Sequence, residues 1–158
     1  MPVERRKLSF ATLDEVVADA ENLLANGYDR AGNWDLGQVA GHLANWLSYP
    51  VEGFPKFPLV FWPILWLMRV TTGKVLLREY LAEGMPSGKP TLRMTVPKSG
   101  GDPKVAVAKL NAAATKFAAH TGPIHPSPLF GAMNKDTAVR LQLRHCEHHL
   151  SFLIPKPV

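Results

Sequence analysis

The chain has 158 residues, 46% hydrophobic and 20% charged, a composition that excludes wholesale disorder and predicts a single domain over residues 1–158. Its net charge of +5 comes from scattered lysines and arginines without the aromatic-basic motif of a nucleic-acid module, so we expect no nucleic-acid partner. A single cysteine excludes an internal disulfide framework, and the N-terminus lacks an apolar signal segment, so we expect a cytoplasmic protein.

Two amphipathic helices are predicted in the first third of the chain. The first covers residues 12–26, because Thr12 begins a capping box and Gly27 supplies a C-terminal stop. The second covers residues 34–49 and is expected to end at Pro50, which biases the residue before it away from helical conformation.

Residues 50–101 form a long connection that contains an apolar run at residues 57–68. Twelve uncharged residues fall short of the roughly 20 that a membrane-spanning helix needs, so we expect no membrane span. We expect the run to cover the core, to pair two subunits into a homodimer or to rest on a lipid surface, in that order. Short helices are predicted over residues 63–71 and 74–83, and residues 91–96 are expected to be extended.

Two more amphipathic helices follow the connection. The third is predicted over residues 102–120, where Asp102 is an N-cap and Pro103 occupies the first helical position. The fourth is predicted over residues 134–153, before Pro155. The sequence therefore predicts an all-α protein, a four-helix bundle with a long, partly helical crossover between its second and third helices.

The fourth predicted helix carries a histidine cluster, and no other segment points as clearly to chemistry. His145 and His149 are one helical turn apart and lie in the apolar sector, whereas His148 lies at the polar border. Each buried imidazole needs partners for two ring nitrogens, and a shared cation satisfies one nitrogen of each. This helix alone is compatible with a metal site and with a structural polar network. Its solvent face is assigned to Arg140, Arg144, Glu147 and Ser151.

Helical phase also limits what the cluster can be. A zinc-protease motif needs a glutamate directly after its first histidine, whereas Glu147 comes two residues after His145 and is expected to face solvent. Cys146 points inward and is interpreted as a small hydrophobic residue. A third ligand candidate is His42, at the edge of the apolar sector of the second helix, where it suits either a cleft-facing ligand or an exposed side chain.

The sequence resembles the DinB-like superfamily, specifically an uncharacterised branch of it. The motifs that carry the resemblance are Trp-Asp-Leu-Gly-Gln-Val-Ala-Gly-His-Leu at residues 34–43, His-Pro-Ser-Pro-Leu-Phe-Gly at residues 125–131 and the His-x-x-x-His of the fourth helix. The similarity spans most of the chain and is weak over residues 50–101. It implies a four-helix bundle in which one histidine of the second helix and two of the fourth bind a divalent metal. Carried onto this sequence, the ligands are His42, His145 and His149.

Three neutral imidazoles leave open positions on a bound ion, as in a catalytic site, and imidazole suits several metals, so we expect Zn, Ni, Fe or Mn. The resemblance implies a metal-dependent transferase that acts on a small molecule with a low-molecular-weight thiol. A metal-dependent hydrolase and a non-catalytic, metal-stabilised bundle are the alternatives. Gln38 and Gln142 are candidates to orient a ligand or substrate, or satisfied core amides. Asp35 is the one acidic candidate for a general base on these inward faces.

Overall fold

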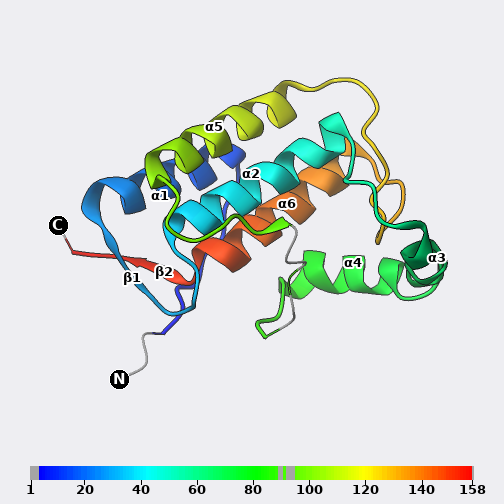
Figure 1. Ribbon diagram of the computed structural model, residues 1–158, viewed down its shortest axis with the longest axis horizontal. Coiled ribbons are helices and arrows are strands. Elements are labelled where there is room, and N and C mark those ends of the chain that lie inside the picture. The colour runs from blue at the N-terminus through cyan, green and yellow to red at the C-terminus, as the bar shows by residue number, and fades with distance from the viewer. Residues whose placement is uncertain (1–3, 89–90, 92–94, 158) are drawn as a thin grey trace.

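The computed structural model describes residues 4–88, 91 and 95–157, and this part of the chain is mostly helical (Figure 1). One small two-stranded sheet accompanies the helices, in agreement with the predicted all-α class. The elements in chain order are α1 (Leu13–Asn26), β1 (Tyr28–Arg30), α2 (Leu36–Glu52), the 3-10 helix η1 (Leu59–Phe61), α3 (Trp62–Val70), α4 (Gly73–Glu83), α5 (Pro103–Ala119), α6 (Lys135–Leu150) and β2 (Leu153–Pro155).

The four longest helices share one hydrophobic core. α2 packs along α5 and against α6, and α1 contacts α2, α5 and α6. Half of the buried residues of α5 are alanines, and its larger buried members are Val107, Leu110 and Phe117. Small side chains let two helix backbones approach closely, which explains why the contact between α2 and α5 is the most extensive of the fold. This packing holds α2 and α6, the two helices that carry the histidines, side by side (Figure 1).

The prediction that the second helix ends before Pro50 is wrong, because α2 continues through this proline to Glu52. A proline inside a helix has no N–H to donate, so the carbonyl four residues earlier loses its partner. Here that carbonyl belongs to Trp46, and the side-chain Nε2 of Gln142 donates to it at 3.0 Å. An amide from α6 therefore replaces the hydrogen bond that Pro50 removes, and it links the two histidine-bearing helices.

The C-terminal end also differs from the prediction, since α6 ends at Leu150 and not at residue 153. The next residues form β2, which pairs antiparallel with β1 in the register Tyr28 to Pro155 and Arg30 to Leu153. Strands of three residues are too short to show a period-two pattern, so the local sequence does not reveal them. The pairing ties the end of the chain to the α1–α2 connection.

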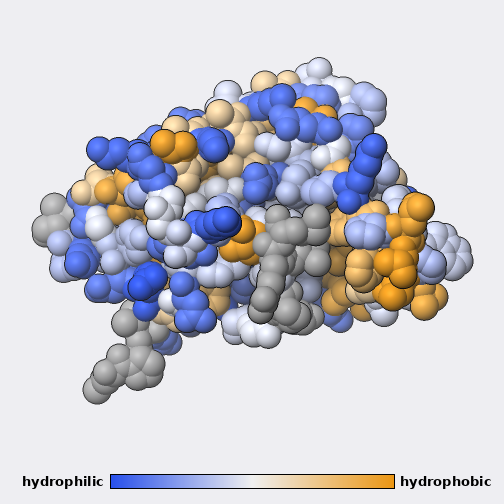
Figure 2. All heavy atoms as spheres, viewed as in Figure 1, coloured by the Kyte–Doolittle hydropathy of each residue, from blue (hydrophilic) through white to orange (hydrophobic). Residues whose placement is uncertain are grey.

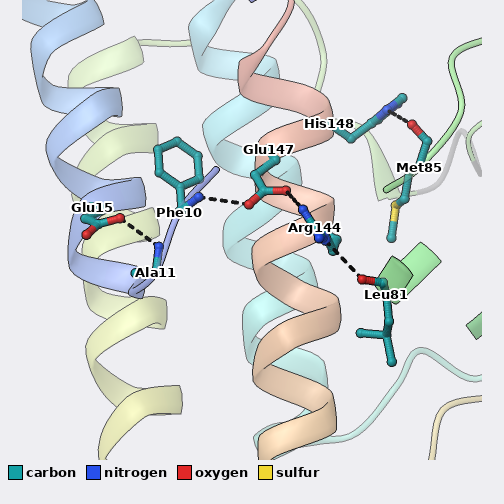
Figure 3. A network of polar contacts seen from close by, with 8 residues as sticks. All are labelled: Phe10, Ala11, Glu15, Leu81, Met85, Arg144, Glu147 and His148. Atoms are coloured by element: carbon teal, nitrogen blue, oxygen red, sulfur yellow. Dashed lines mark hydrogen bonds and ion pairs between the residues drawn. The ribbon is translucent and has the colours of Figure 1, made fainter. Parts of the chain in front are cut away.

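The polar face assigned to α6 is only partly exposed, and the prediction is wrong for Glu147 and Ser151, which are both buried. The N-terminal segment covers both residues, and Figure 3 shows its contact with Glu147. The backbone N–H of Phe10 donates to Glu147 Oε1 at 2.8 Å, and Arg144 donates to Glu147 Oε2 at 3.0 Å. Arg5 Nε donates to Ser151 Oγ at 3.1 Å. Helical phase cannot anticipate a cover that comes from the other end of the chain.

The connection after α2 forms both predicted helices, but its apolar run does not cover the core as first expected. η1 and α3 contain no buried residue. The reason is that α4 lies against α6, while α3 packs on η1 and α4 and so stays outside the core helices. Of the segment expected to be extended, residues 92–94 lie outside the described residues, and Thr95 and Val96 belong to no strand.

No single helix in the described ranges is long and apolar enough to cross a membrane. The stretches Leu59–Val70 and Gly73–Glu83 pass that test only as a pair, and they are bent by 61° at the break between them.

Candidate metal centre

Three histidines meet where α2 and α6 pack together. His42 comes from α2, and His145 and His149 come from successive turns of α6. One ring nitrogen from each residue lies within 4.8 Å of the others, and Nε2 of His42 is 3.3 Å from Nε2 of His145. The structure thus brings together the three residues that the resemblance implies as ligands, and their arrangement suits a single ion.

His42 is fully buried, although helical phase placed it at the edge of the apolar sector. Its Nδ1 lies 3.0 Å from the backbone carbonyl of Thr95. Because a carbonyl oxygen only accepts, Nδ1 carries the proton and donates it, so the unprotonated Nε2 is the atom that accepts from Nε2 of His145 at 3.3 Å. A hydrogen bond of this type orients metal-binding histidines, since it sets both the tautomer and the plane of the ring. The segment at Thr95 therefore covers His42 and aims its Nε2 at the α6 histidines.

Tryptophan side chains enclose the three imidazoles. The ring of Trp34 stacks on His149, with centroids 5.0 Å apart and planes 3° from parallel. Trp46 contacts His145 edge-on at a centroid distance of 5.5 Å. Contacts of this kind restrict the rotation of each imidazole and keep water away from it. The rings are therefore held in place before any ligand arrives.

Burial keeps these imidazoles neutral. It lowers the pKa of His42 to about 4, although the Thr95 carbonyl opposes the shift. Burial, reinforced by the nearby His42, lowers the pKa of His149 to about 2. Burial and the neighbouring His149 hold the pKa of His145 well below its ordinary value. Metal ions bind the neutral form of histidine, so these three side chains need not lose a proton near pH 7 to act as ligands.

The spacing of the nitrogens fits a small divalent ion. Zinc binds imidazole nitrogens at about 2.0–2.1 Å, so two such nitrogens in a tetrahedral site are about 3.3–3.4 Å apart. The pair formed by His42 and His145, at 3.3 Å, already has this separation. The three nitrogens lie within 4.8 Å of one another, so a bound ion would require the wider separations to shorten. The donor set of three neutral imidazoles is also one that Zn, Ni and Fe accept.

A cavity of about 250 Å³ opens beside the cluster, and all three histidines line it. Its other walls come from α2, α4 and α6, from the residues that follow α2 and α4, and from the loop before α6, including Phe54, Tyr80 and Phe130. None of the described lining residues is Asp, Glu, Lys or Arg. The site therefore combines three potential ligands with a mostly apolar space large enough for a small molecule.

A comparison with known protein families identifies the family of the chain. The family described as "Protein of unknown function (DUF1569)" matches residues 3–156. The chain belongs to the DUF1569 family. No curated protein and no solved structure matches it.

Gln142 of this DUF1569 protein lies in the cavity wall, whereas Gln38 has a different role. Gln142 donates from Nε2 to the Trp46 carbonyl, and its buried Oε1 accepts no hydrogen bond from the described residues. Gln38 forms a capping box with Asp35 and donates from Nε2 to the carbonyl of Pro97 at 3.2 Å. Gln38 therefore acts on the site indirectly, because it holds the segment that covers His42.

Asp35 and Cys146 have structural positions in the DUF1569 fold. The carboxylate of Asp35 accepts from the backbone N–H of Gln38 at 2.8 Å and of Gly100 at 3.3 Å, so it caps α2. It is not among the residues that line the cavity. Cys146 is fully buried, and burial raises the pKa of its thiol, so it behaves as a small hydrophobic residue.

His148 also faces the cavity, although helical phase places it at the polar border of the helix. Its Nδ1 donates to the carbonyl of Met85 at 3.0 Å (Figure 3), which leaves Nε2 as an acceptor. Burial lowers the pKa of His148. Sequence reasoning missed the Thr95 carbonyl and the stacking of Trp34 on His149, because neither contact has a signal in local spacing.

A substitution at Gly41 tests how strongly metal binding by the DUF1569 protein depends on the segment at Thr95 that covers His42. A Cβ at this position would lie 2.7 Å from Cγ of Pro97, so Gly41→Ala must displace the segment that follows Thr95. We expect metal affinity to fall by about 10- to 100-fold, as for the loss of a partner that orients a ligand. Isothermal titration with zinc measures this. Gly101→Ala is the matched control, because its Cβ would meet only an ordinary contact at 3.9 Å. Equal affinities in both variants would contradict the assigned role of the cover.

Proposed function

We propose that this DUF1569 protein binds one divalent metal ion through His42, His145 and His149 and is a DinB-like four-helix bundle. The observation that carries the proposal is the convergence of three ring nitrogens within 4.8 Å in the wall of an open cavity. The packing of four long helices around a common core supports the bundle assignment. The ion is Zn, Ni, Fe or Mn, of which Zn, Ni and Fe suit imidazole donors best.

The position of the cluster favours a catalytic site over a structural one. Structural zinc sites are closed by four protein ligands, whereas catalytic sites have three and keep a position open. Here three histidines face a cavity, and the described part of the chain supplies no fourth His, Cys, Asp or Glu to the cluster. An ion held there would supply Lewis acidity, which lowers the pKa of a coordinating thiol or water.

We further propose that the reaction is transfer involving a low-molecular-weight thiol and an electrophilic small molecule. Metal-dependent hydrolases commonly use a carboxylate as the general base, but the described residues of the cavity include no acidic side chain. A thiol needs less help, because its ordinary pKa is close to neutral. The apolar walls would hold the electrophile, and the neutral imidazole of His148, anchored on Met85, can accept the thiol proton.

Metal analysis of the untagged protein, purified without chelator, tests the first part of the proposal. We expect about one equivalent of Zn, Ni, Fe or Mn per chain by elemental mass spectrometry, because the site provides three preorganised ligands. Metal-free protein should regain the ion in titration and unfold at a higher temperature once it is loaded. Protein that contains no metal and takes up none of these four ions would overturn the assignment.

Activity measurements then separate transferase from hydrolase and from inert bundle. Metal-loaded and metal-free protein are compared with a panel of small thiols and electrophiles, and separately with ester and amide substrates. The transferase proposal expects a metal-dependent rate only when a thiol is present. A metal-dependent rate without a thiol would indicate a hydrolase, and a loaded protein without any such rate would indicate a metal-stabilised bundle.

A further inference from the structure

The apolar run that the fold leaves uncovered has the features of a lipid-binding surface. Nine of the ten exposed large hydrophobic side chains in the described part of the chain lie between Leu59 and Val75. Figure 2 shows that hydrophobic residues gather at the end of the molecule formed by α3. We call this surface the α3 patch; its members are Leu59, Val60, Phe61, Trp62, Ile64, Trp66, Leu67, Val70 and Val75. A contiguous patch of this kind marks an interaction site.

The α3 patch is convex. On a helical wheel the exposed positions from Trp62 to Val70 span roughly 200° of α3, which is more than half of its circumference. Leu59, in the preceding turn, is 84% exposed. A protein partner would need a deep, matching pocket to cover such a protrusion, whereas a lipid surface accommodates it without a preformed shape. Trp62 and Trp66, 55% and 63% exposed, are the residue type that favours the membrane interface.

The charged side chains beside the α3 patch are mainly positive. Residues 54–78 contain Lys56, Arg69, Lys74 and Arg78 and no Asp or Glu, and the exposed Glu79 follows directly on α4. Lys56, Lys74 and Arg78 are exposed, and no carboxylate of the described residues forms an ion pair with any of the four. Basic residues beside an exposed apolar helix are complementary to anionic phospholipid headgroups.

The same charges argue against a second copy of the chain as the occupant. In a two-fold symmetric dimer the patch meets itself, so each subunit would bring four basic residues to the interface against one adjoining acidic residue, Glu79. Like charges placed across an interface oppose association. The homodimer predicted from the apolar run therefore has no support from the charge pattern of this surface.

We propose that the α3 patch docks this protein on an anionic lipid surface. The apolar and tryptophan side chains insert among the headgroups and upper acyl chains, and Lys56, Lys74 and Arg78 contact phosphate groups. The docking is peripheral and reversible, and it is independent of metal binding at the histidine cluster.

Vesicle sedimentation with the full chain tests this proposal. We expect binding to vesicles of phosphatidylcholine and phosphatidylglycerol at a 7:3 ratio to be at least about tenfold stronger than binding to phosphatidylcholine alone. The binding should weaken as salt is added. Phospholipids brominated on the upper acyl chain should quench tryptophan fluorescence in the bound state, which reports contact between the patch and lipid.

Two pairs of variants locate the contact. Trp62→Ser/Trp66→Ser should lower the affinity for anionic vesicles at least about tenfold and abolish the quenching, because both side chains are exposed and their loss leaves the core intact. Val105→Ser, at a 51% exposed position on α5, is the matched control.

Lys74→Gln/Arg78→Gln should lower the affinity about 25-fold, because one basic residue near an anionic membrane contributes about a factor of five. Lys104→Gln/Lys109→Gln, at exposed positions on α5, is its control and should bind as the native chain does.

Either of two results overturns the proposal. The first is a native chain that does not bind the anionic vesicles, whether or not it forms a dimer or binds an acidic protein through the patch. The second is binding that the tryptophan and basic variants leave unchanged.

Discussion

Replacing His145 or His149 with alanine is expected to reduce the affinity of the protein for zinc by at least about 100-fold. Each substitution removes one of three nitrogens that lie within 4.8 Å of one another, and no described carboxylate or thiol is placed to substitute for it. His42→Ala should have the same effect. Isothermal titration of metal-free protein with zinc measures the affinity, and elemental analysis of the purified variants measures how much metal they retain.

His148→Ala is the control for these variants, because it lies on the same end of α6 and lines the same cavity but is not part of the ligand cluster. It should bind zinc with nearly native affinity. Thermal unfolding without metal shows whether each variant is folded, and only the ligand variants should lose the rise in melting temperature on metal addition. If His148→Ala lost the metal while His145→Ala kept it, the ligand assignment would be wrong.

The metal-free protein is expected to lose stability as the pH falls from 7.5 to 5. An unfolded histidine has a pKa near 6.5, whereas burial lowers the pKa of His42 to about 4 and that of His149 to about 2. Between these values the unfolded chain binds more protons than the folded chain, so the free energy of unfolding rises with pH. The contribution of His42 and His149 to the free energy of unfolding is therefore fully present above about pH 6.5. It is lost as the pH drops from there toward the pKa that each residue has in the folded protein. At pH 5 each of the two residues accounts for a loss of about 2 kcal/mol.

Urea unfolding in the presence of a chelator, at pH 7.5 and at pH 5, measures this loss. A His149→Gln variant should lose about 2 kcal/mol less than the native chain over the same interval, because glutamine does not titrate. Zinc affinity should stay nearly constant from pH 7.5 to pH 6, since the imidazoles of the folded protein are already neutral there. Equal free energies of unfolding at the two pH values would show that the imidazoles titrate normally.

These two predictions describe one property of the site. Three imidazoles, of which His42 is fully buried, are placed against one another and enclosed by Trp34 and Trp46. Without a ligand this arrangement gains little stability from its polar atoms, because the described residues give its ring nitrogens only two hydrogen bonds. One runs from Nδ1 of His42 to the Thr95 carbonyl, and the other joins the Nε2 atoms of His42 and His145. A bound cation would satisfy a nitrogen of each ring and remove the sensitivity to acid. The three histidines are therefore well placed to bind a metal ion but contribute little to the stability of the metal-free protein.

Local sequence predicts most of the helical framework. Thr12, Asp102 and Asn134 cap three helices at the expected places, and Gly27 ends the first. Caps and helical periodicity act within one or two turns, so a single segment contains all the information that they need. The same periodicity places His145 and His149 on the inward side of α6, where the structure brings them together with His42.

Contacts between distant segments account for the errors. Pro50 does not end α2, because Gln142 of another helix supplies the donor that the proline lacks. Glu147 is buried, since Phe10 and the N-terminal segment lie over it. The apolar run at residues 57–68 stays exposed, because α4 takes the place against α6 that a core-covering helix would need.

The sequence by itself determined which side chains are available to the site and which face of α6 carries two of them, because residue type and helical phase are local properties. Only the tertiary structure decided that His42 is buried and that its Nδ1 donates to Thr95, 53 residues away, so that its Nε2 faces His145. It also decided that the histidines line a cavity without acidic side chains among its described residues. Packing between distant segments sets burial, tautomer and access, and no pattern within one helix contains that information.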